Sequence, residues 1–274
     1  MDKFLHRVLF AIAYFILYVE QSHIVLGNVS RIVGGHDAPA RFGRFHASLR
    51  NLTGHHVCGG AVVSKWHVVT AAHCVFGANP QYIKVFIGTT RLDRGGKRYN
   101  VSAIHINDNY NRSTRSNDIA VVTIKGTFDC CYAAGIKMHE YELVEGDPVT
   151  ITGFGALEPK GDSSPQLRAL NVTVFSQATC VYAMRYSREV TSNMFCTFTK
   201  IGEGTCHGDS GSPVTKDDKL VGVVSWGIPC ARGFPDVHTR IKPFIGWIKK
   251  LIRAHYCGLK SNYKEVVKTM KHVK

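Results

Sequence analysis

The stretch Gly208-Asp209-Ser210-Gly211 places one serine between two glycines. Two earlier segments complete the pattern: 70–74 reads Thr-Ala-Ala-His-Cys, and 117–121 reads Asn-Asp-Ile-Ala-Val. A serine hydroxyl is a weak nucleophile until a neighbouring imidazole takes its proton. A buried carboxylate orients that imidazole and stabilises the positive charge that it gains. The three segments therefore predict acyl-transfer chemistry with His73, Asp118 and Ser210 as the catalytic residues.

The glycines beside Ser210 would let the backbone approach a substrate closely. We therefore expect the amide N–H groups of Gly208 and Ser210 to form an oxyanion hole. The catalytic residues follow the order His, Asp, Ser, whereas an α/β-hydrolase has Ser, Asp or Glu, His. The elbow of that fold also needs glycine two residues after the serine, where this chain has Ser212. The α/β-hydrolase fold is excluded.

The body of the chain reads as short β-strands separated by clusters of Gly, Asn, Asp and Pro, as in sandwiches and barrels. The expected strands are rich in β-branched and aromatic residues, and they cover 57–63, 67–70, 82–87, 119–124, 148–152, 170–175 and 220–226. One helix is expected near the end of the chain, where apolar residues recur at helical spacing. These residues are Phe244, Ile245, Ile248, Leu251 and Ile252.

The first residues indicate secretion. Lys3 and Arg7 precede an apolar run over 8–19, which is shorter than the roughly 20 residues needed to cross a bilayer. This is the pattern of a signal peptide, which we assign to 1–22, with an uncleaved anchor as the alternative. Nine cysteines suit an oxidising, extracellular compartment. Five glycosylation sequons suit the same route, at Asn28, Asn51, Asn100, Asn111 and Asn171.

The formal net charge of +14 favours acidic partners. Sulfated glycans, anionic lipid surfaces and acidic proteins all fit, and the alternative is a soluble surface with a solvated basic tail over 258–274. We expect no nucleic-acid partner for a secreted protein, no cofactor, no metal and no transmembrane span.

Five stretches occur in a fixed order: 32–35 (Ile-Val-Gly-Gly), 70–74, 117–121, 208–213 and 225–227 (Ser-Trp-Gly). Together they resemble the chymotrypsin–trypsin family of serine proteases over nearly all of 32–253. The resemblance implies an all-β fold of two packed six-stranded antiparallel barrels with a C-terminal α-helix, the peptidase domain covering 32–257. It also implies a serine endopeptidase whose partners are peptide or protein substrates and serine protease inhibitors. A noncatalytic homologue is disfavoured, because all three catalytic residues are present.

The resemblance further implies a zymogen with an activation peptide over 23–31. Cleavage after Arg31 by a trypsin-like protease would free the amino group of Ile32, which would pair with the carboxylate of Asp209. An ammonium buried beside a carboxylate is tolerable only as a pair. That pair would hold Gly208 and its N–H in place.

Three disulfides are implied by the same resemblance: Cys58–Cys74, Cys180–Cys196 and Cys206–Cys230. Three other cysteines, Cys130, Cys131 and Cys257, have no counterpart in the family. We expect Cys257, just past the terminal helix, to pair with one of the other two, which would leave one thiol over.

The specificity pocket is also assigned by resemblance. Gly204 would form its floor, Gly227 would leave one wall open, and Asp236 would stand on the opposite wall. Ser225 and Trp226 are also expected to bind substrate. This combination resembles arthropod digestive chymotrypsins and crustacean collagenolytic proteases. We expect cleavage after large apolar residues, with minor activity after basic ones. Trypsin-like or broad collagenolytic specificity through Asp236 is one alternative, and a glycan- or protein-binding effector with incidental proteolysis is another.

Several positions depart from the family pattern. Ser212 replaces a usual glycine, Phe154 a usual tryptophan, and His238 a usual tyrosine behind the pocket. The loop 88–99 lacks the glutamates of a trypsin-type calcium site, so no calcium is expected there. His55 and His56 are expected to lie in an exposed loop rather than to bind a metal.

Overall fold

The computed structural model describes residues 33–228 and 230–271, with side chains described as far as Leu259. The predicted signal peptide and activation peptide, with Arg31 and Ile32, lie outside the described residues. Among those described, no helix is long and apolar enough to cross a membrane.

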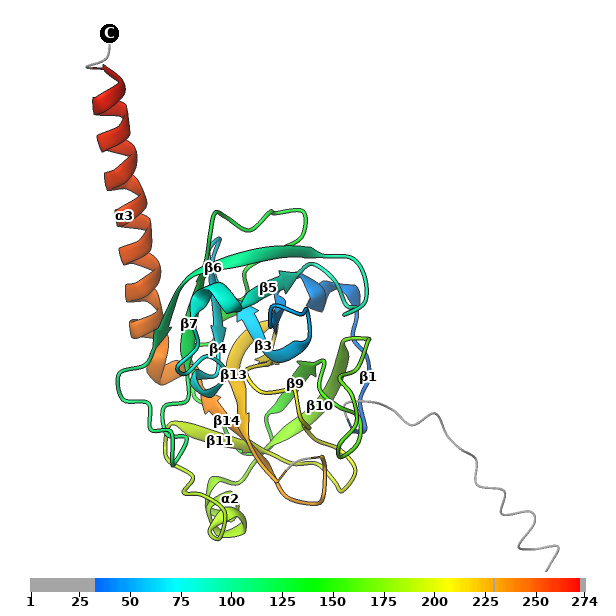
Figure 1. Cartoon of the computed structure of the whole chain (residues 1–274). Helices are drawn as coiled ribbons and strands as arrows, with labels where there is room; N and C mark the ends of the chain where they lie inside the picture. The colour runs from blue at the N-terminus through cyan, green and yellow to red at the C-terminus, as the bar shows by residue number, and fades with distance from the viewer. Residues whose placement is uncertain (1–32, 229, 272–274) are drawn as a thin grey trace, which may run out of the picture. The chain divides into compact units, whose positions relative to one another are not determined.

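Six antiparallel strands of the N-terminal half close into a barrel in the order β2-β3-β4-β7-β6-β5 (Figure 1). Their interior is filled by a cluster that includes Leu49, Val68, Ile87 and Val122, which are 2% exposed or less. Burial of such apolar surface is the main favourable term in folding. The strands are β2 (His46–Arg50), β3 (His56–Val62), β4 (His67–Thr70), β5 (Lys84–Ile87), β6 (Lys97–Ile106) and β7 (Ala120–Ile124).

A second antiparallel barrel follows in the order β10-β11-β14-β13-β12-β9, closed by pairing between β9 and β10. Its strands are β9 (Pro148–Gly153), β10 (Arg168–Phe175), β11 (Met194–Thr197), β12 (Pro213–Lys216), β13 (Lys219–Trp226) and β14 (Asp236–Arg240). Two short strands add to this sheet: β1 (His36–Asp37) pairs with β10, and β8 (Lys137–Met138) pairs in parallel with β13. The expected pair of six-stranded antiparallel barrels is confirmed.

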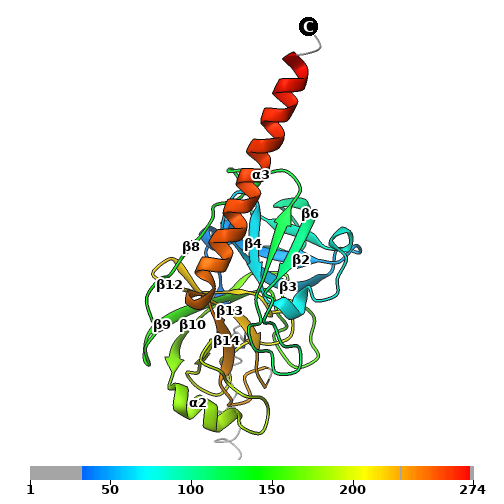
Figure 2. The ribbon, with the colours of Figure 1, turned by 90° about the vertical axis from the view of Figure 1, so that its left-hand side faces the viewer.

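The two barrels share an apolar cluster. Val69 and Val121 of the first barrel pack there with Leu220 and Val223 of the second, all fully buried. The helix α3 (Ile245–Lys271) adds Ile248 to the same cluster, so its first turns cover the joint between the barrels (Figure 2). A shorter helix, α2 (Gln177–Met184), begins at Ser176, whose hydroxyl accepts from the N–H of Thr179.

The terminal helix is longer than expected and corrects one prediction. It continues past Cys257 through most of the segment that was expected to be a basic tail. Cys130, Cys131 and Cys257 are all exposed and free, so the expected pairing of Cys257 is wrong. A disulfide needs its two Cα atoms within about 7 Å. A helix that runs on through Cys257 does not turn the chain back toward the other two thiols.

The three disulfides implied by the resemblance are present in the structure. Cys58–Cys74 ties β3 to the short 3-10 helix Ala72–Cys74, which contains His73. Cys180–Cys196 joins α2 to β11, and Cys206–Cys230 joins the segment before Ser210 to the segment before β14. Each bridge closes a loop of 16 or 24 residues, which is worth roughly 3 kcal/mol in the chain-entropy estimate.

Several buried histidines make the fold sensitive to acid. His46 is 1% exposed and its Nδ1 lies 2.9 Å from Thr152 Oγ1 across the barrel joint. Burial lowers the pKa of His46 to about 3, with the charge of His56 acting in the same direction. The unfolded chain therefore binds a proton at this residue between about pH 6.5 and 3 that the folded chain does not. Stability from this site is complete above pH 6.5 and is lost as the pH falls.

We expect His46→Gln, which can keep a bond to Thr152, to weaken this dependence. Between pH 6.5 and 5 the free energy of unfolding should fall less steeply in the variant, by up to about 1.4 kcal/mol per pH unit. Urea titrations at several pH values measure the slope. The exposed His36→Gln is the matched control, and equal slopes for wild type and His46→Gln would contradict the prediction.

Candidate active site

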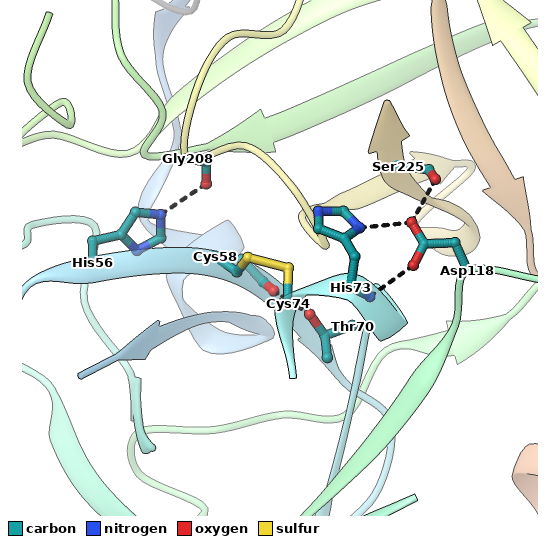
Figure 3. The surroundings of a disulfide bond; sticks show 9 residues. His56, Cys58, Thr70, His73, Cys74, Asp118, Gly208 and Ser225 are labelled. Atoms are coloured by element: carbon teal, nitrogen blue, oxygen red, sulfur yellow. Dashed lines mark hydrogen bonds and ion pairs between the residues drawn. A yellow bond between two sulfur atoms is a disulfide. The ribbon is translucent and has the colours of Figure 1, made fainter. Parts of the chain in front are cut away.

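His73 and Asp118 are joined at two points (Figure 3). The Nδ1 of His73 lies 2.7 Å from Asp118 Oδ2, and the backbone N–H of His73 donates to Oδ1 at 2.9 Å. A carboxylate can only accept, so Nδ1 carries the hydrogen and Nε2 is left free to accept a proton. The double contact fixes both the tautomer and the orientation of the imidazole, which is what a general base needs. The role of His73 as that base stays a prediction.

Asp118 is completely buried and lies two residues before β7. Ser225 Oγ donates to its Oδ2 at 2.6 Å (Figure 3). Thr239 Oγ1 donates to its backbone carbonyl at 3.0 Å. Burial raises the pKa of Asp118 to about 7, while the bond from Ser225 and the charge of Arg115 lower it. A carboxylate that is costly to bury alone gains most from a cation beside it, which is what His73 becomes on protonation.

The turn that carries Ser210 lies against the strand that leads to His73. The N–H of Gly59 donates to the carbonyl of Ser210 at 2.8 Å, and the N–H of Gly211 donates to Val224 at 2.7 Å. Gly211 has a φ of +75°, and a Cβ added there would lie 2.2 Å from Thr70 Oγ1 and 3.0 Å from the nitrogen of Ala71. Only glycine allows this approach. The glycine of the motif is thus explained by the close contact between the two segments.

Gly208, the expected oxyanion residue, is held through its carbonyl. Its φ is +94°, and His56 Nε2 lies 2.9 Å from its oxygen (Figure 3). The expectation that His55 and His56 both lie in an exposed loop is wrong for His56, which is half-buried on β3. His55 is exposed. His55 lies just before β3, outside the strand that holds His56.

Asp209 points into the protein beside Gly208. It is completely buried and accepts from the N–H groups of Gly155 at 2.8 Å and Cys206 at 3.0 Å. Burial raises the pKa of Asp209 to about 6, and these two bonds lower it. A Cβ added at Gly155 would lie 2.4 Å from the carboxylate, so this glycine provides its space. Ile32 is outside the described residues, and its pairing with Asp209 stays a prediction.

The pocket residues meet around Asp236. A Cβ added at Gly204 would lie 2.8 Å from Asp236 Oδ2, and one at Gly227 would lie 3.0 Å from Oδ1. The carboxylate therefore reaches both glycines. Thr205, which no sequence motif singled out, donates to Oδ2 from its N–H at 2.7 Å and to Oδ1 from its hydroxyl at 2.8 Å. Burial raises the pKa of Asp236 to about 7, while the bonds from Thr205 lower it.

The residues that depart from the family pattern are all buried. His238 Nε2 lies 2.7 Å from Thr197 Oγ1, and burial lowers its pKa to about 3, which keeps the ring neutral. Phe154 contacts the rings of His46 and His56 edge-on. A Cβ added at Gly59 would lie 2.1 Å from Ser212 Oγ, so the Ser212 side chain fits only because residue 59 is glycine. Thr197 thus binds His238 and two histidine rings contact Phe154, whereas the Ser212 hydroxyl is buried without a hydrogen-bond partner among the described residues.

Two groups of described residues have the atoms to ligate a metal within 4.8 Å of one another. In the first, His73 lies beside Cys58 and Cys74, whose sulfurs are bonded to each other. The second is Asp129, Cys130 and Cys131 at the surface. Sulfurs bonded in a disulfide are not thiolates, which are the form of cysteine that ligates metals, so the first group leaves His73 as a single ligand.

Comparisons with known proteins agree with this geometry. The family model described as Trypsin matches residues 32–248. Chymotrypsin-2 of Vespa crabro is 36% identical over 223 residues, which cover 80% of this chain and 99% of that protein. Trypsin 5G1 of Aedes aegypti is 33% identical over 82% of this chain and 86% of its own length. Trypsin, alkaline A of Manduca sexta is 37% identical over 70% and 78%.

The close approach at Gly211 generates a prediction. Gly211→Ala should lower kcat/KM by about 100-fold or more, because the added methyl must displace the serine turn, and misplacing a reacting group by about 1 Å can cost that much. Gly77→Ala is the matched control: Gly77 also has a positive φ, +71°, but nothing lies within 4 Å of an added Cβ. Hydrolysis rates of both folded variants decide the matter. Near-normal activity of Gly211→Ala would contradict the tight packing between the two segments.

Proposed function

The chain belongs to the trypsin family of serine endopeptidases, and we propose that His73, Asp118 and Ser210 are its catalytic triad. The observation that carries the proposal is the double contact between His73 and the buried Asp118. It leaves Nε2 of His73 as the free proton acceptor on a segment that the Ser210 turn contacts through Gly211. Replacing Ser210 with alanine should abolish peptide hydrolysis, and a normal rate in a pure sample would refute the proposal.

In the proposed reaction Ser210 Oγ attacks the carbonyl carbon of the scissile bond while His73 Nε2 takes its proton. The N–H groups of Gly208 and Ser210 stabilise the oxyanion. His73 then gives the proton to the leaving amine, and a water molecule repeats the sequence to release the acyl group. Asp118 stabilises the imidazolium in both halves, because it stays fixed beside Nδ1.

We further propose a secreted zymogen, with 1–22 as signal peptide and 23–31 as activation peptide. The surroundings of Asp209 support it: among the described residues, its buried carboxylate accepts from two backbone N–H groups and contacts no positive charge. A new ammonium at Ile32 would supply the missing positive charge. The high net positive charge also makes acidic glycans candidate partners outside the cell.

The proposed specificity is cleavage after Phe, Tyr and Leu, with minor cleavage after Arg and Lys. Gly204 and Gly227 leave room for a large side chain, and burial of an aromatic ring drives its binding. Asp236 has both oxygens hydrogen-bonded to Thr205, which supports a largely satisfied wall residue. The alternative, trypsin-like or broad collagenolytic specificity, has its support in the nearness of that carboxylate to both glycines.

Arg31→Gln should give a folded precursor that trypsin-like activators cannot switch on. Asp209 would lack its ammonium partner, and the oxyanion N–H of Gly208 would lack support. The measurement is peptidase activity before and after treatment with trypsin. Full activity of the uncleaved variant would refute activation by Ile32.

Asp236→Asn separates the two specificity hypotheses. Asparagine can still bond to Thr205, so the pocket keeps its shape while the charge disappears. We expect kcat/KM for Arg substrates to fall roughly 30-fold, because losing one partner of a buried charge pair costs about 2 kcal/mol or more. Phe substrates should be cleaved as well as before or better. A strong preference of the wild type for Arg would favour the alternative, and an unchanged Arg-to-Phe ratio would show that Asp236 does not reach the substrate.

A further inference from the structure

Arg50, the last residue of β2, is a buried arginine with no carboxylate in contact among the described residues. It is 9% exposed. Its Nε donates to Ser48 Oγ at 3.1 Å, its Nη1 donates to the carbonyl of Leu92 at 2.9 Å, and its Cζ lies 4.0 Å from the centre of the Phe86 ring. Burial lowers the pKa of Arg50. Burying a cation without a counter-ion costs free energy. The buried position of Arg50 therefore needs a functional explanation.

The hydrogen bonds around Arg50 form a chain with one direction. The carbonyl of Gly208 can only accept, so His56 Nε2 must donate to it. The Nδ1 of a neutral His56 must then accept, and the group 2.8 Å from it is Ser48 Oγ. The Ser48 hydroxyl gives its hydrogen to that nitrogen and receives the Nε–H of Arg50. The direction of all three hydrogen bonds is therefore fixed.

The strands hold this chain in place. Arg50 is paired with His56 across β2 and β3, next to a bulge between Leu49 and Arg50. A bulge turns the side chains of the bulged strand, and here it accompanies the buried position of Arg50. The ring of His56 in turn lies close to Gly208, where an added Cβ would be 3.5 Å from its Cδ2. The series of hydrogen bonds therefore runs from Arg50 to Gly208, in the loop beside Ser210.

We propose that Arg50 is a positioning residue, which acts through Ser48 and His56 to fix the carbonyl of Gly208 and with it the direction of the Gly208 N–H. The inference rests on the proposed function, because it assigns that N–H to the oxyanion hole. To the proposed function it adds Arg50, which lies outside the catalytic motifs of the sequence.

Loss of Arg50 would release Ser48, and through it His56, from their fixed orientations. The Ser48 hydroxyl could turn away, and neutral His56 could move its hydrogen to Nδ1, where it no longer serves Gly208. The charge of Arg50 also helps to keep His56 neutral. The pKa of His56 is lowered to about 4 mainly by burial, while the bond to Gly208 raises it and the charge of Arg50 lowers it further.

The test compares Arg50→Met with wild type in the activated enzyme. Methionine keeps an apolar stem against Phe86 and removes the donors and the charge. Complete loss of one oxyanion donor costs about 100- to 1000-fold in kcat, so a misdirected donor should cost about 10-fold. We expect KM to stay within about 2-fold. Arg41→Met, at an exposed arginine that contacts Phe42, is the matched control.

Two inhibitors separate oxyanion binding from substrate binding. A peptide aldehyde ending in phenylalanine places its oxygen in the oxyanion hole after Ser210 adds to it, and the matching peptide alcohol does not react. In Arg50→Met the inhibition constant of the aldehyde should rise about 10-fold while that of the alcohol stays the same. Equal loss of both inhibitors would mean general distortion and would overturn the proposal.

Ser48→Ala breaks the same series of hydrogen bonds at its middle and leaves Arg50 its contacts with Leu92 and Phe86. If both residues act through His56, the double variant should be no slower than the slower single variant, whereas independent effects would add. Additive losses, or wild-type rates in both single variants, would overturn the proposal. A wild-type enzyme that neither cleaves peptides nor binds the aldehyde would instead refute the proposed function.

Discussion

Asp118 carries a carboxylate into the joint between the two barrels, and groups from both barrels bind it. His73 contacts it from the first barrel, while Ser225 of β13 and Thr239 of β14 reach it from the second. The barrels must pack correctly for this residue to be satisfied, because a buried carboxylate without its donors is expensive. The same packing would put the base and the nucleophile of the proposed triad together. Fold and chemistry therefore depend on one buried charge.

Asp209 and Asp236 repeat this arrangement on a smaller scale. Each is buried, each has a pKa raised by burial, and each lies against glycines that leave it space. Backbone N–H groups of nearby residues bind both. In the proposed function, Asp209 receives a cation on activation, and Asp236 can meet one from a basic substrate. Buried carboxylates that lack a fixed cation in the described residues thus coincide with the places where a cation is proposed to arrive.

The motifs around His73, Asp118 and Ser210 could be predicted because their requirements are local: glycine for a close approach, an acid at the head of a strand. Five barrel strands were not predicted: β2, β6, β11, β12 and β14. In β2 and β14, residues such as His46, Arg50 and His238 look solvent-facing and are in fact buried. Their polar atoms bond to residues distant in the sequence, which no local pattern reveals. The contact of His56 with Gly208 was not predicted either, because Gly208 is distant in the sequence. The full length of α3 was also missed, because its last residues do not continue the apolar pattern of its first turns.

The buried Asp118 is proposed to make His73 the base that activates Ser210, and every later step depends on this activation. A fluorophosphonate, which reacts with an activated serine by losing fluoride, measures it directly. Mass spectrometry of the labelled, activated enzyme should place a single phosphonyl group on Ser210, among all its serines. The rate of labelling should fall steeply in Asp118→Asn and be lost in His73→Ala. Labelling at another serine, or an unchanged rate in His73→Ala, would contradict this mechanism.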